Sequence, residues 1–410
     1  MKAFDRENYG WTICAASFLL LFCTGGLAVT GFTIYQSYLI SDLGLSNTLA
    51  SAMLLFRNLF GMVGMFISPV LIKRFEIRRV VTAAAVLCAA GFAVFGLAGG
   101  FALCCVAASM TGLSYGLGGM IPVSILINRW FEEHTGLALG VCMAATGLSA
   151  TVASPVIVTV IEHYSLQTAF FAEAAFILLA ALIVHTMLRS RPDCLNVHPI
   201  GYHMHIGGLS HGNFAPRTAP RLLVIWMALG IFIFGAPANT LHPHVSVLYN
   251  QLGFKSGDVT TMVSLLGFSL AIGKCVYGLI ADKIGLYRAS WILYTLAAAG
   301  TFCCCLAGNH SIAVAFAGVA MMGFGLAVTT VSISMYASAL ASEADYSKTV
   351  TLFQVMSTAG ALVSGSIPGI IADITGSYVP AFQLLLVLLV LSACMLQFGF
   401  LRAKKLTSAK

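Results

Sequence analysis

Two basic side chains lie inside long apolar stretches of this sequence, where a charge is unfavourable. Lys274 interrupts the apolar run 262–281, eight residues before Asp282. At about 1.5 Å per residue, its ammonium would lie roughly 12 Å from the end of that helix, near the middle of a bilayer. A cation at that depth costs on the order of 2.5–3.5 kcal/mol on insertion scales. Lys274 is therefore predicted to bind an anion rather than to reach the membrane surface by snorkelling.

Arg57 is the second cation inside an apolar run, about ten residues or roughly 15 Å from one end of its predicted helix. Its guanidinium can form two parallel hydrogen bonds with a carboxylate. The alternative is a structural arginine that binds carbonyl groups at a helix end or pairs with Glu173. Two cations and few acids within the apolar runs predict a positive cavity that favours anions, with Lys274 and Arg57 as ligands.

Three further titratable residues in the apolar runs are candidates for carrying a proton. Glu173 lies about one and a half turns from the end of its helix, where burial would favour proton uptake. His242 and His244 flank Pro243 and follow Pro237, and histidine titrates in the physiological range. The two prolines predict a broken or kinked helix, as occurs near transport sites and gates. The alternative for the histidines is a hydrogen-bonded role in a gate.

Three uncharged polar residues are predicted to contact a substrate at mid-depth, namely Asn239, Tyr115 and Thr30. Such side chains also often hydrogen-bond only to neighbouring helices. Four histidines between residues 198 and 211 lie near Cys194, but their spacing matches no closed zinc site. No metal and no other cofactor is expected.

Composition places the chain among helical membrane proteins. Apolar residues make up 59% of the 410 residues and charged residues 9%, compared with about 25% charged residues in soluble domains. Continuous apolar runs predict membrane helices rather than the alternating strands of a barrel. The net charge of +7 comes from short loops between these runs, so it indicates orientation in a lipid bilayer and not nucleic-acid binding.

Twelve membrane helices are expected, in an all-α membrane fold with two pseudo-symmetric six-helix bundles. The polar segment 190–218 separates an N-terminal bundle, 1–189, from a C-terminal bundle, 219–410. All Lys and Arg residues except Arg57, Lys255 and Lys274 fall on one side, which predicts that both termini and the central segment are cytoplasmic. The expected helices span residues 11–40, 47–72, 80–98, 101–128, 136–161, 168–189, 219–250, 257–281, 289–307, 311–340, 348–372 and 378–401.

The two halves repeat each other. The turn KRFEIRR at 73–79 matches the turn DKIGLYR at 282–288, and 146–170 parallels 359–382 at an offset of about 212 residues. Together with the central segment, this repeat resembles the major facilitator superfamily, whose two six-helix repeats enclose a site at the membrane midplane. The second turn supplies a predicted conformational latch that joins helix ends through charge pairs and helix dipoles. The latch residues are Asp282, Lys283, Gly285 and Arg288.

A closer resemblance comes from three short segments. The segments NRWF at 128–131, GLALG at 136–140 and DITGSY at 373–378 resemble the oxalate/formate antiporter and monocarboxylate porter families. The resemblance covers most of the chain and implies a carrier of small carboxylate anions. It also implies that Lys274 stands where these families carry a basic anion-binding residue.

Two positions depart from the family pattern. The first-half turn has Lys73 and Arg74 where the family usually has an aspartate, so a charge lock there is not expected. Oxalate carriers place a second lysine in the eleventh helix, whereas Ser357 stands nearest to that position in this chain. This difference argues against a copy of the oxalate site.

These observations predict a secondary active transporter of small monocarboxylate anions such as lactate, pyruvate or formate. It would work by alternating access as a monomer in the plasma or inner membrane. Proton symport is the expected coupling, because an anion that enters against a negative-inside potential needs a compensating charge. The alternatives are exchange for a counter-anion of the oxalate/formate type, an inorganic-anion carrier such as one for nitrate, and a non-transporting sensor. No enzyme is expected, because no nucleophile–base pair or nucleotide loop occurs.

Overall fold

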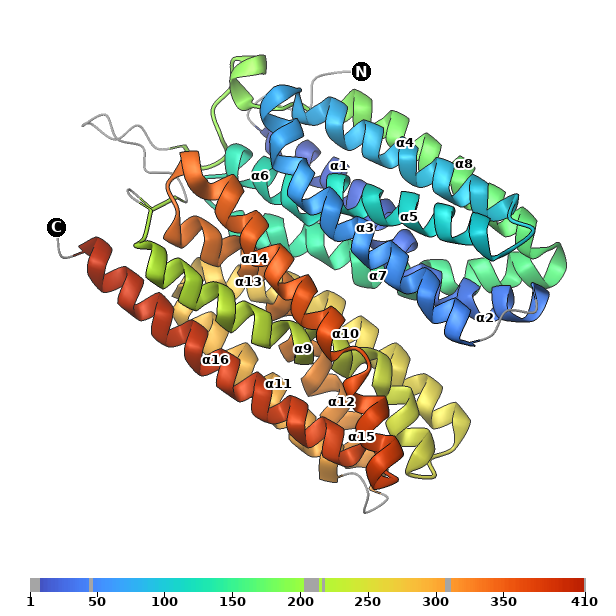
Figure 1. The fold of residues 1–410 in the computed structure, drawn as a ribbon. Helices are drawn as coiled ribbons and strands as arrows, with labels where there is room; N and C mark the ends of the chain where they lie inside the picture. Colours follow the sequence, from blue (N-terminus) through green and yellow to red (C-terminus); the bar gives the residue numbers. More distant parts are fainter. Residues whose placement is uncertain (1–7, 44–46, 203–213, 216–217, 307–310, 409–410) are drawn as a thin grey trace. The chain divides into compact units, whose positions relative to one another are not determined.

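The computed structural model of the chain consists mainly of long helices (Figure 1). It describes residues 8–43, 47–202, 214–215, 218–306 and 311–408. Within these residues, twelve helical stretches are long and apolar enough to cross a membrane, which confirms the predicted number. A helix satisfies its own backbone N–H and C=O groups, which lipid cannot do, and this explains why each apolar run takes that form.

The first half of the chain contains a π-helix, η2, which interrupts the first membrane helix, and a break at Gly119 in the fourth. The elements are α1 (Tyr9–Leu21), η2 (Phe22–Gly31), α2 (Phe32–Asp42), α3 (Asn47–Arg74), α4 (Ile77–Gly96), α5 (Phe101–Gly118), α6 (Met120–Trp130), α7 (Thr135–His163) and α8 (Leu166–Met187).

The second half begins after a short 3-10 helix, η3 (Pro192–Leu195), in the central segment. Its elements are α9 (Arg221–Gln251), α10 (Ser256–Ile284), α11 (Leu286–Leu306), α12 (Ile312–Leu326), α13 (Val328–Leu340), α14 (Glu343–Ser364), α15 (Ile367–Thr375) and α16 (Val379–Ser408).

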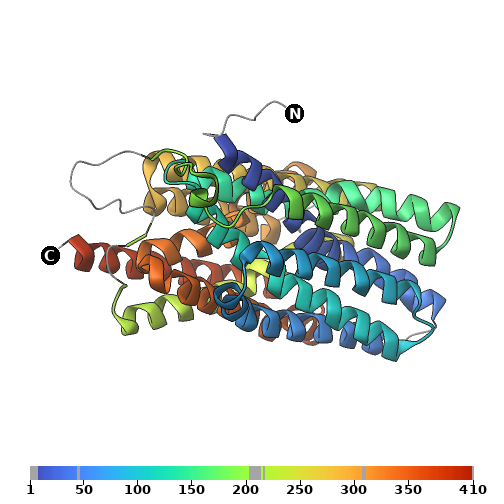
Figure 2. The same cartoon turned by 90° about the horizontal axis from the view of Figure 1, so that it is seen from above.

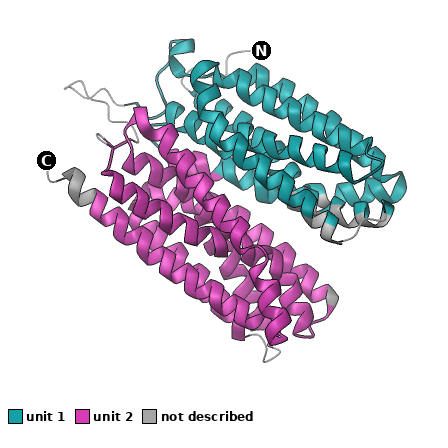
Figure 3. Cartoon of the chain, in the orientation of Figure 1, with its two compact units in different colours: residues 1–133, 141–204 teal, residues 134–140, 205–410 magenta. Residues whose placement is uncertain are grey.

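The chain divides by its contacts into two compact units (Figure 3). Unit 1 comprises residues 1–133 and 141–204, and unit 2 comprises residues 134–140 and 205–410. The first turn and a half of α7 therefore belongs to unit 2, whereas the rest of α7 belongs to unit 1. The two units are considered separately below.

Helix pairing inside each unit reflects the internal repeat (Figures 1 and 2). In unit 1, α5 packs against α3 and α4, and α8 packs against α4 and α1. In unit 2, α12 packs against α10 and α11, and α16 packs against α11 and α9. These four pairs correspond one to one along the chain, so the repeated sequence builds this part of the packing twice.

The positions of the helix breaks differ from the expectation. The prolines at 237 and 243 predicted a broken or kinked helix; α9 is not broken there and runs as one helix from Arg221 to Gln251 with both prolines inside it. The breaks fall instead at Gly119, at Ala327 between α12 and α13, and at residues 365–366 between α14 and α15. A proline removes one backbone bond, and neighbouring helices can support a continuous membrane helix around it.

Both described ends of the central segment are held by backbone hydrogen bonds. In unit 1, the Ile200 N–H donates to the Trp130 carbonyl over 2.9 Å, and the Glu132 N–H donates to the Ile200 carbonyl over 2.9 Å. In unit 2, the Ala219 N–H donates to the Leu340 carbonyl over 2.8 Å, and the Ala215 N–H donates to the Ser338 carbonyl over 3.0 Å. The contacts are at the α6–α7 junction in one unit and at the equivalent α13–α14 junction in the other.

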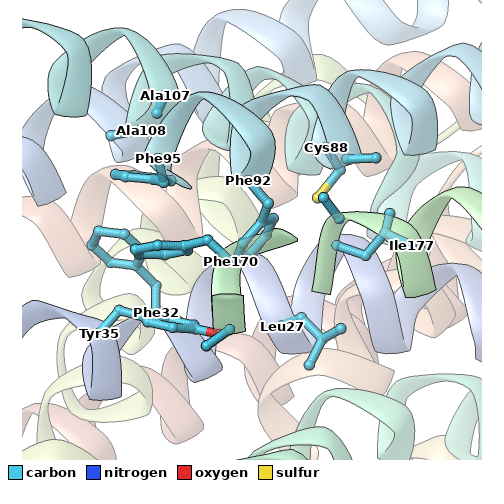
Figure 4. Packing of buried hydrophobic residues seen from close by; sticks show 14 of the residues in the cluster. Leu27, Phe32, Tyr35, Cys88, Phe92, Phe95, Ala107, Ala108, Phe170 and Ile177 are labelled. Atoms are coloured by element: carbon cyan, nitrogen blue, oxygen red, sulfur yellow. The ribbon is translucent and has the colours of Figure 1, made fainter. Parts of the chain in front are cut away.

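A cluster of aromatic rings fills the interior of unit 1 (Figure 4). The rings of Tyr35 and Phe170 stack with centroids 4.3 Å apart, and the ring of Phe95 stacks with that of Phe170 at 5.3 Å. Phe32 lies 5.0 Å from Phe95, and Phe92 lies 6.3 Å from Phe170. These contacts join α2 to α4 and α8, and they fix the position of Tyr35.

Replacing Phe170 with alanine is expected to destabilise unit 1, because the ring is 1% exposed and contacts three others. The expected loss is roughly 1–3 kcal/mol, below the 3–5 kcal/mol of a soluble core, because lipid rather than water is the alternative environment. The measurement is the thermal unfolding midpoint of the purified protein. Phe171→Ala is the matched control, since that ring is 39% exposed, and equal midpoints for the two variants would contradict the prediction.

Candidate functional site

Lys274 is buried in the interior of unit 2, with 3% of its surface exposed. It lies about ten residues, or roughly 15 Å, before the end of α10 at Ile284. The backbone there touches the beginning of α7, because a side-chain carbon at Gly140 would overlap the Lys274 carbonyl oxygen. Only glycine permits this approach, so Gly140 helps to fix the height of Lys274.

The two histidines of α9 have different surroundings. His242 is partly buried and lies close enough to Lys274 for the two side chains to interact electrostatically. His244 instead donates from Nδ1 to the Thr240 carbonyl oxygen over 2.8 Å, and its ring lies 6.1 Å from that of Tyr378. The structure therefore brings His242, and not His244, to Lys274.

Arg57 lies in unit 1 and is 8% exposed. Its Nη1 donates to the Val29 carbonyl oxygen over 3.0 Å, its Nη2 donates to Asn58 Oδ1 over 3.3 Å, and its Nε has no partner within the described residues. The guanidinium also lies over the Phe32 ring, 5.7 Å from the centroid. The Nε–H of Arg57 is therefore a donor from which a ligand could accept a hydrogen bond.

Two of the three predicted polar contacts are described side chains, and their surroundings differ. Tyr115 is partly buried and lies close enough to Arg57 to interact with it electrostatically. Asn239 is exposed and donates from Nδ2 to the Gly235 carbonyl oxygen of its own helix over 3.0 Å. The side chain of Thr30 lies outside the described residues.

Glu173 is 7% exposed on α8 and does not use Arg57 as its hydrogen-bond partner. Its Oε2 accepts a hydrogen bond from the Tyr35 hydroxyl. Tyr35 had not been singled out from the sequence. The available signal is the spacing of Val29, Phe32 and Tyr35, which places them three residues apart on one helical face.

The turn between α10 and α11 has the tight geometry that its sequence predicted. Gly285 has φ +87°, a conformation that favours glycine, and α11 begins at the next residue. Asp282 Oδ1 accepts a hydrogen bond from the Gly136 N–H over 2.8 Å, and Oδ2 accepts one from the Leu137 N–H over 2.9 Å. The carboxylate therefore caps the positive N-terminal end of α7.

Lys283 and Arg288 are exposed on the same turn. Neither takes part in the ion pairs found within the described residues, which join Arg79 to Glu76 and Lys348 to Asp345. The geometry of the turn thus assigns the helix-dipole contact to Asp282.

The counterpart turn in unit 1 uses the opposite charge. Arg78 Nε donates to the His185 carbonyl oxygen over 2.6 Å, near the end of α8. A cation at the C-terminal end of a helix is the complement of an anion at an N-terminal end.

Metal ligands do not gather in the described residues, where no group of three or more His, Cys, Asp and Glu side chains is placed to hold an ion. His198 stacks on Tyr202 with ring centroids 4.3 Å apart. The histidines at 203, 205 and 211 lie outside the described residues.

Comparison with known proteins identifies relatives over the whole chain. Monocarboxylate transporter 12 of Mus musculus is 23% identical, and the alignment covers 97% of this chain and 86% of that protein. Monocarboxylate transporter 12 of Homo sapiens is 21% identical over 96% of this chain and 80% of that protein. An MFS-type transporter of Gibberella moniliformis is 28% identical over 63% of this chain and 60% of that protein.

Solved structures share the fold. The proton:xylose symporter XylE superposes with a TM-score of 0.77 at 14% identity, covering 95% of each chain. The human organic anion transporter MFSD10 superposes with a TM-score of 0.64 at 16% identity, covering 95% of this chain and 97% of the other. The family model described as Major Facilitator Superfamily matches residues 16–254 and 227–410. With the twelve membrane helices, this match shows that the chain belongs to the major facilitator superfamily, a family of membrane transporters and not of enzymes.

Proposed function

We propose that the protein is a secondary active transporter of small monocarboxylate anions, with Lys274 as the principal anion-binding residue. The observation that carries this proposal is the burial of the Lys274 ammonium, 3% exposed and far from either end of α10. Relatives named monocarboxylate transporters, aligned over nearly the whole chain, support the same substrate class.

The physical argument is charge compensation. An ammonium within the membrane costs on the order of 2.5–3.5 kcal/mol, and a bound carboxylate offsets this cost through a charge-assisted hydrogen bond. His242 beside Lys274 supplies a second hydrogen-bonding group for the same carboxylate. A substrate with one carboxylate matches one lysine, which favours lactate, pyruvate or formate.

Arg57 supports a second candidate function. Arg57 is buried in unit 1, and its Nε has no hydrogen-bond partner within the described residues. If it shared a ligand with Lys274, the protein would suit a dianion or an inorganic anion such as nitrate. The Arg57 bond to the Val29 carbonyl also fits a structural role, so the monocarboxylate function remains the main proposal.

Proton symport is the proposed coupling. One elementary charge that crosses 100 mV costs about 2.3 kcal/mol, so an anion that enters a negative-inside cell gains from a proton that moves with it. His242, His244 and Glu173 remain the proton-carrying candidates. Exchange for a counter-anion is the alternative that needs no proton.

Alternating access would move the six-helix bundles, 1–189 and 219–410, about the site while segment 190–218 joins them. The proposed setting is the plasma or inner membrane, with both termini in the cytoplasm and a monomer as the working unit. The contact of Asp282 with the end of α7 is the proposed latch that one state forms and another releases.

Transport assays test the site directly. Lys274→Ala is expected to lower kcat/KM for labelled lactate by about 10- to 100-fold, because a hydrogen bond to a charged group contributes roughly 1.5–3 kcal/mol. The measurement is uptake into proteoliposomes, with lactate, formate, oxalate and nitrate compared with and without an inward proton gradient. Lys274→Arg, which keeps the charge, is expected to retain part of the uptake.

Lys255→Ala is the matched control, since that lysine is exposed before the start of α10. Uptake that is equally fast in Lys274→Ala and in Lys255→Ala would remove Lys274 from the site. Uptake of nitrate or oxalate alone would support the second candidate function, and uptake of none of the four anions would overturn both.

The pair of histidines supplies a second test. His242→Gln is expected to raise KM for lactate roughly three- to tenfold, because a hydrogen-bonding group next to Lys274 is altered. His244→Gln is expected to leave KM nearly unchanged, because His244 binds its own helix at Thr240. A larger effect at His244 would contradict the assignment.

The latch can be tested by hydrogen exchange. Asp282→Asn keeps the shape of the side chain but removes the charge, so amide exchange at Gly136 and Leu137 is expected to accelerate about tenfold. Mass spectrometry of the peptide that covers residues 134–145 is the measurement. Asp258→Asn, in the first turn of α10, is the control, and unchanged exchange in Asp282→Asn would exclude the latch.

A further inference from the structure

Glu173 forms part of the wall of an otherwise apolar cavity in unit 1. The cavity has a volume of about 290 Å³ and lies between η2, α2, α7 and α8. Its other walls include the apolar side chains of Leu27, Val152, Val156 and Phe176. Apart from Tyr35, the side chains of these walls offer the carboxyl group no hydrogen-bond partner.

The carboxyl group is only half satisfied. Oε2 accepts from the Tyr35 hydroxyl, whereas Oε1 is buried with no hydrogen-bond partner within the described residues. An ionised oxygen left in this way is far less favourable than the neutral hydroxyl of a protonated carboxyl group. The surroundings therefore favour a glutamic acid that carries its proton.

The neighbouring titratable groups do not offer a cation. Tyr35 faces Glu173 from α2, Cys23 from η2 and Cys88 from α4, and all three are groups that are neutral or can only become negative. The side chains that α7 contributes to the cavity wall are apolar. The hydrogen bond from the Tyr35 hydroxyl supports the ionised form, but no cation among the described residues faces the carboxyl group, and burial favours the neutral form.

One helical segment connects Glu173 with Arg57. The guanidinium of Arg57 binds the carbonyl of Val29 and lies over the ring of Phe32, and Tyr35, three residues further, binds Glu173. Val29 lies in the π-helix η2, which ends at Gly31, and α2 begins with Phe32. π-Helical stretches inside α-helices often occur at functional sites.

We infer that Glu173 is the residue that carries the coupled proton, and that residues 29–35 link its protonation to the state of Arg57. The inference rests on the proposed transport of a monocarboxylate. A monocarboxylate that binds Arg57 transiently, without Lys274 as a shared ligand, draws the guanidinium from the Val29 carbonyl and releases the segment that holds Tyr35 against Glu173. The ionised carboxylate takes up one proton from water on one side and returns it on the other, so one anion and one proton move together without net charge.

The test uses the full-length protein in proteoliposomes that contain a pH-sensitive dye. In proteoliposomes with the wild type, added lactate is expected to enter together with protons. Glu173→Gln is expected to lose the proton uptake and the gradient-driven accumulation, but to keep exchange of labelled for unlabelled lactate. Tyr35→Phe removes the hydroxyl while the stacked ring remains, and it is expected to reduce proton uptake without abolishing exchange.

Glu162→Gln is the matched control, because that glutamate is exposed near the end of α7. It is expected to behave as the wild type in both assays. Proton uptake that persists in Glu173→Gln would overturn the inference and leave the transport function intact. Lactate exchange without proton uptake in the wild type would do the same.

Infrared spectroscopy separates the inference from the substrate. The carbonyl stretch of a protonated carboxylic acid is expected in the wild type at neutral pH and is expected to be lost in Glu173→Gln. If none of the anions is transported, the proposed function fails, and this band alone decides whether Glu173 holds a proton. Identical spectra of wild type and Glu173→Gln would overturn the inference in every case.

Discussion

The low polarity of the membrane interior is the constraint on which the rest of this structure depends. Every backbone group must be satisfied within a helix, and each buried ionisable side chain needs a partner or a neutral form. Arg57 meets this requirement with a backbone carbonyl and an aromatic ring, and Glu173 with a tyrosine hydroxyl. Lys274 lies near His242, at a close contact between helices, and we propose that a bound substrate anion balances its charge.

The repeat supplies the same scaffold twice, but the charged turns of its halves differ. In one, Asp282 caps the N-terminal end of α7, and in the other, Arg78 caps the C-terminal end of α8. Opposite charges thus serve opposite helix ends. The two halves share packing while their turns hold different partners, so a change of sequence in one turn need not be matched in the other.

The sequence was sufficient to predict the elements that depend on a short stretch of neighbouring residues. Twelve apolar runs predicted twelve spans, and Gly285 marked a turn that requires positive φ. The breaks at Gly119 and Ala327, the π-helix and the pairing of Tyr35 with Glu173 depend on neighbours distant in the chain, which no local pattern specifies. For the same reason the prolines of α9 suggested a broken or kinked helix, and α9 is unbroken.

The anchoring of the central segment bears on how the chain can be divided. Its first part is hydrogen-bonded to the α6–α7 junction of unit 1 and its last part to the α13–α14 junction of unit 2, on either side of residues 203–213. A polypeptide cut between Tyr202 and Phe214 would leave each fragment with its own anchoring bonds intact. The two halves are therefore suited to separate synthesis and recombination, with reporter fragments fused at the new ends to follow their assembly in cells.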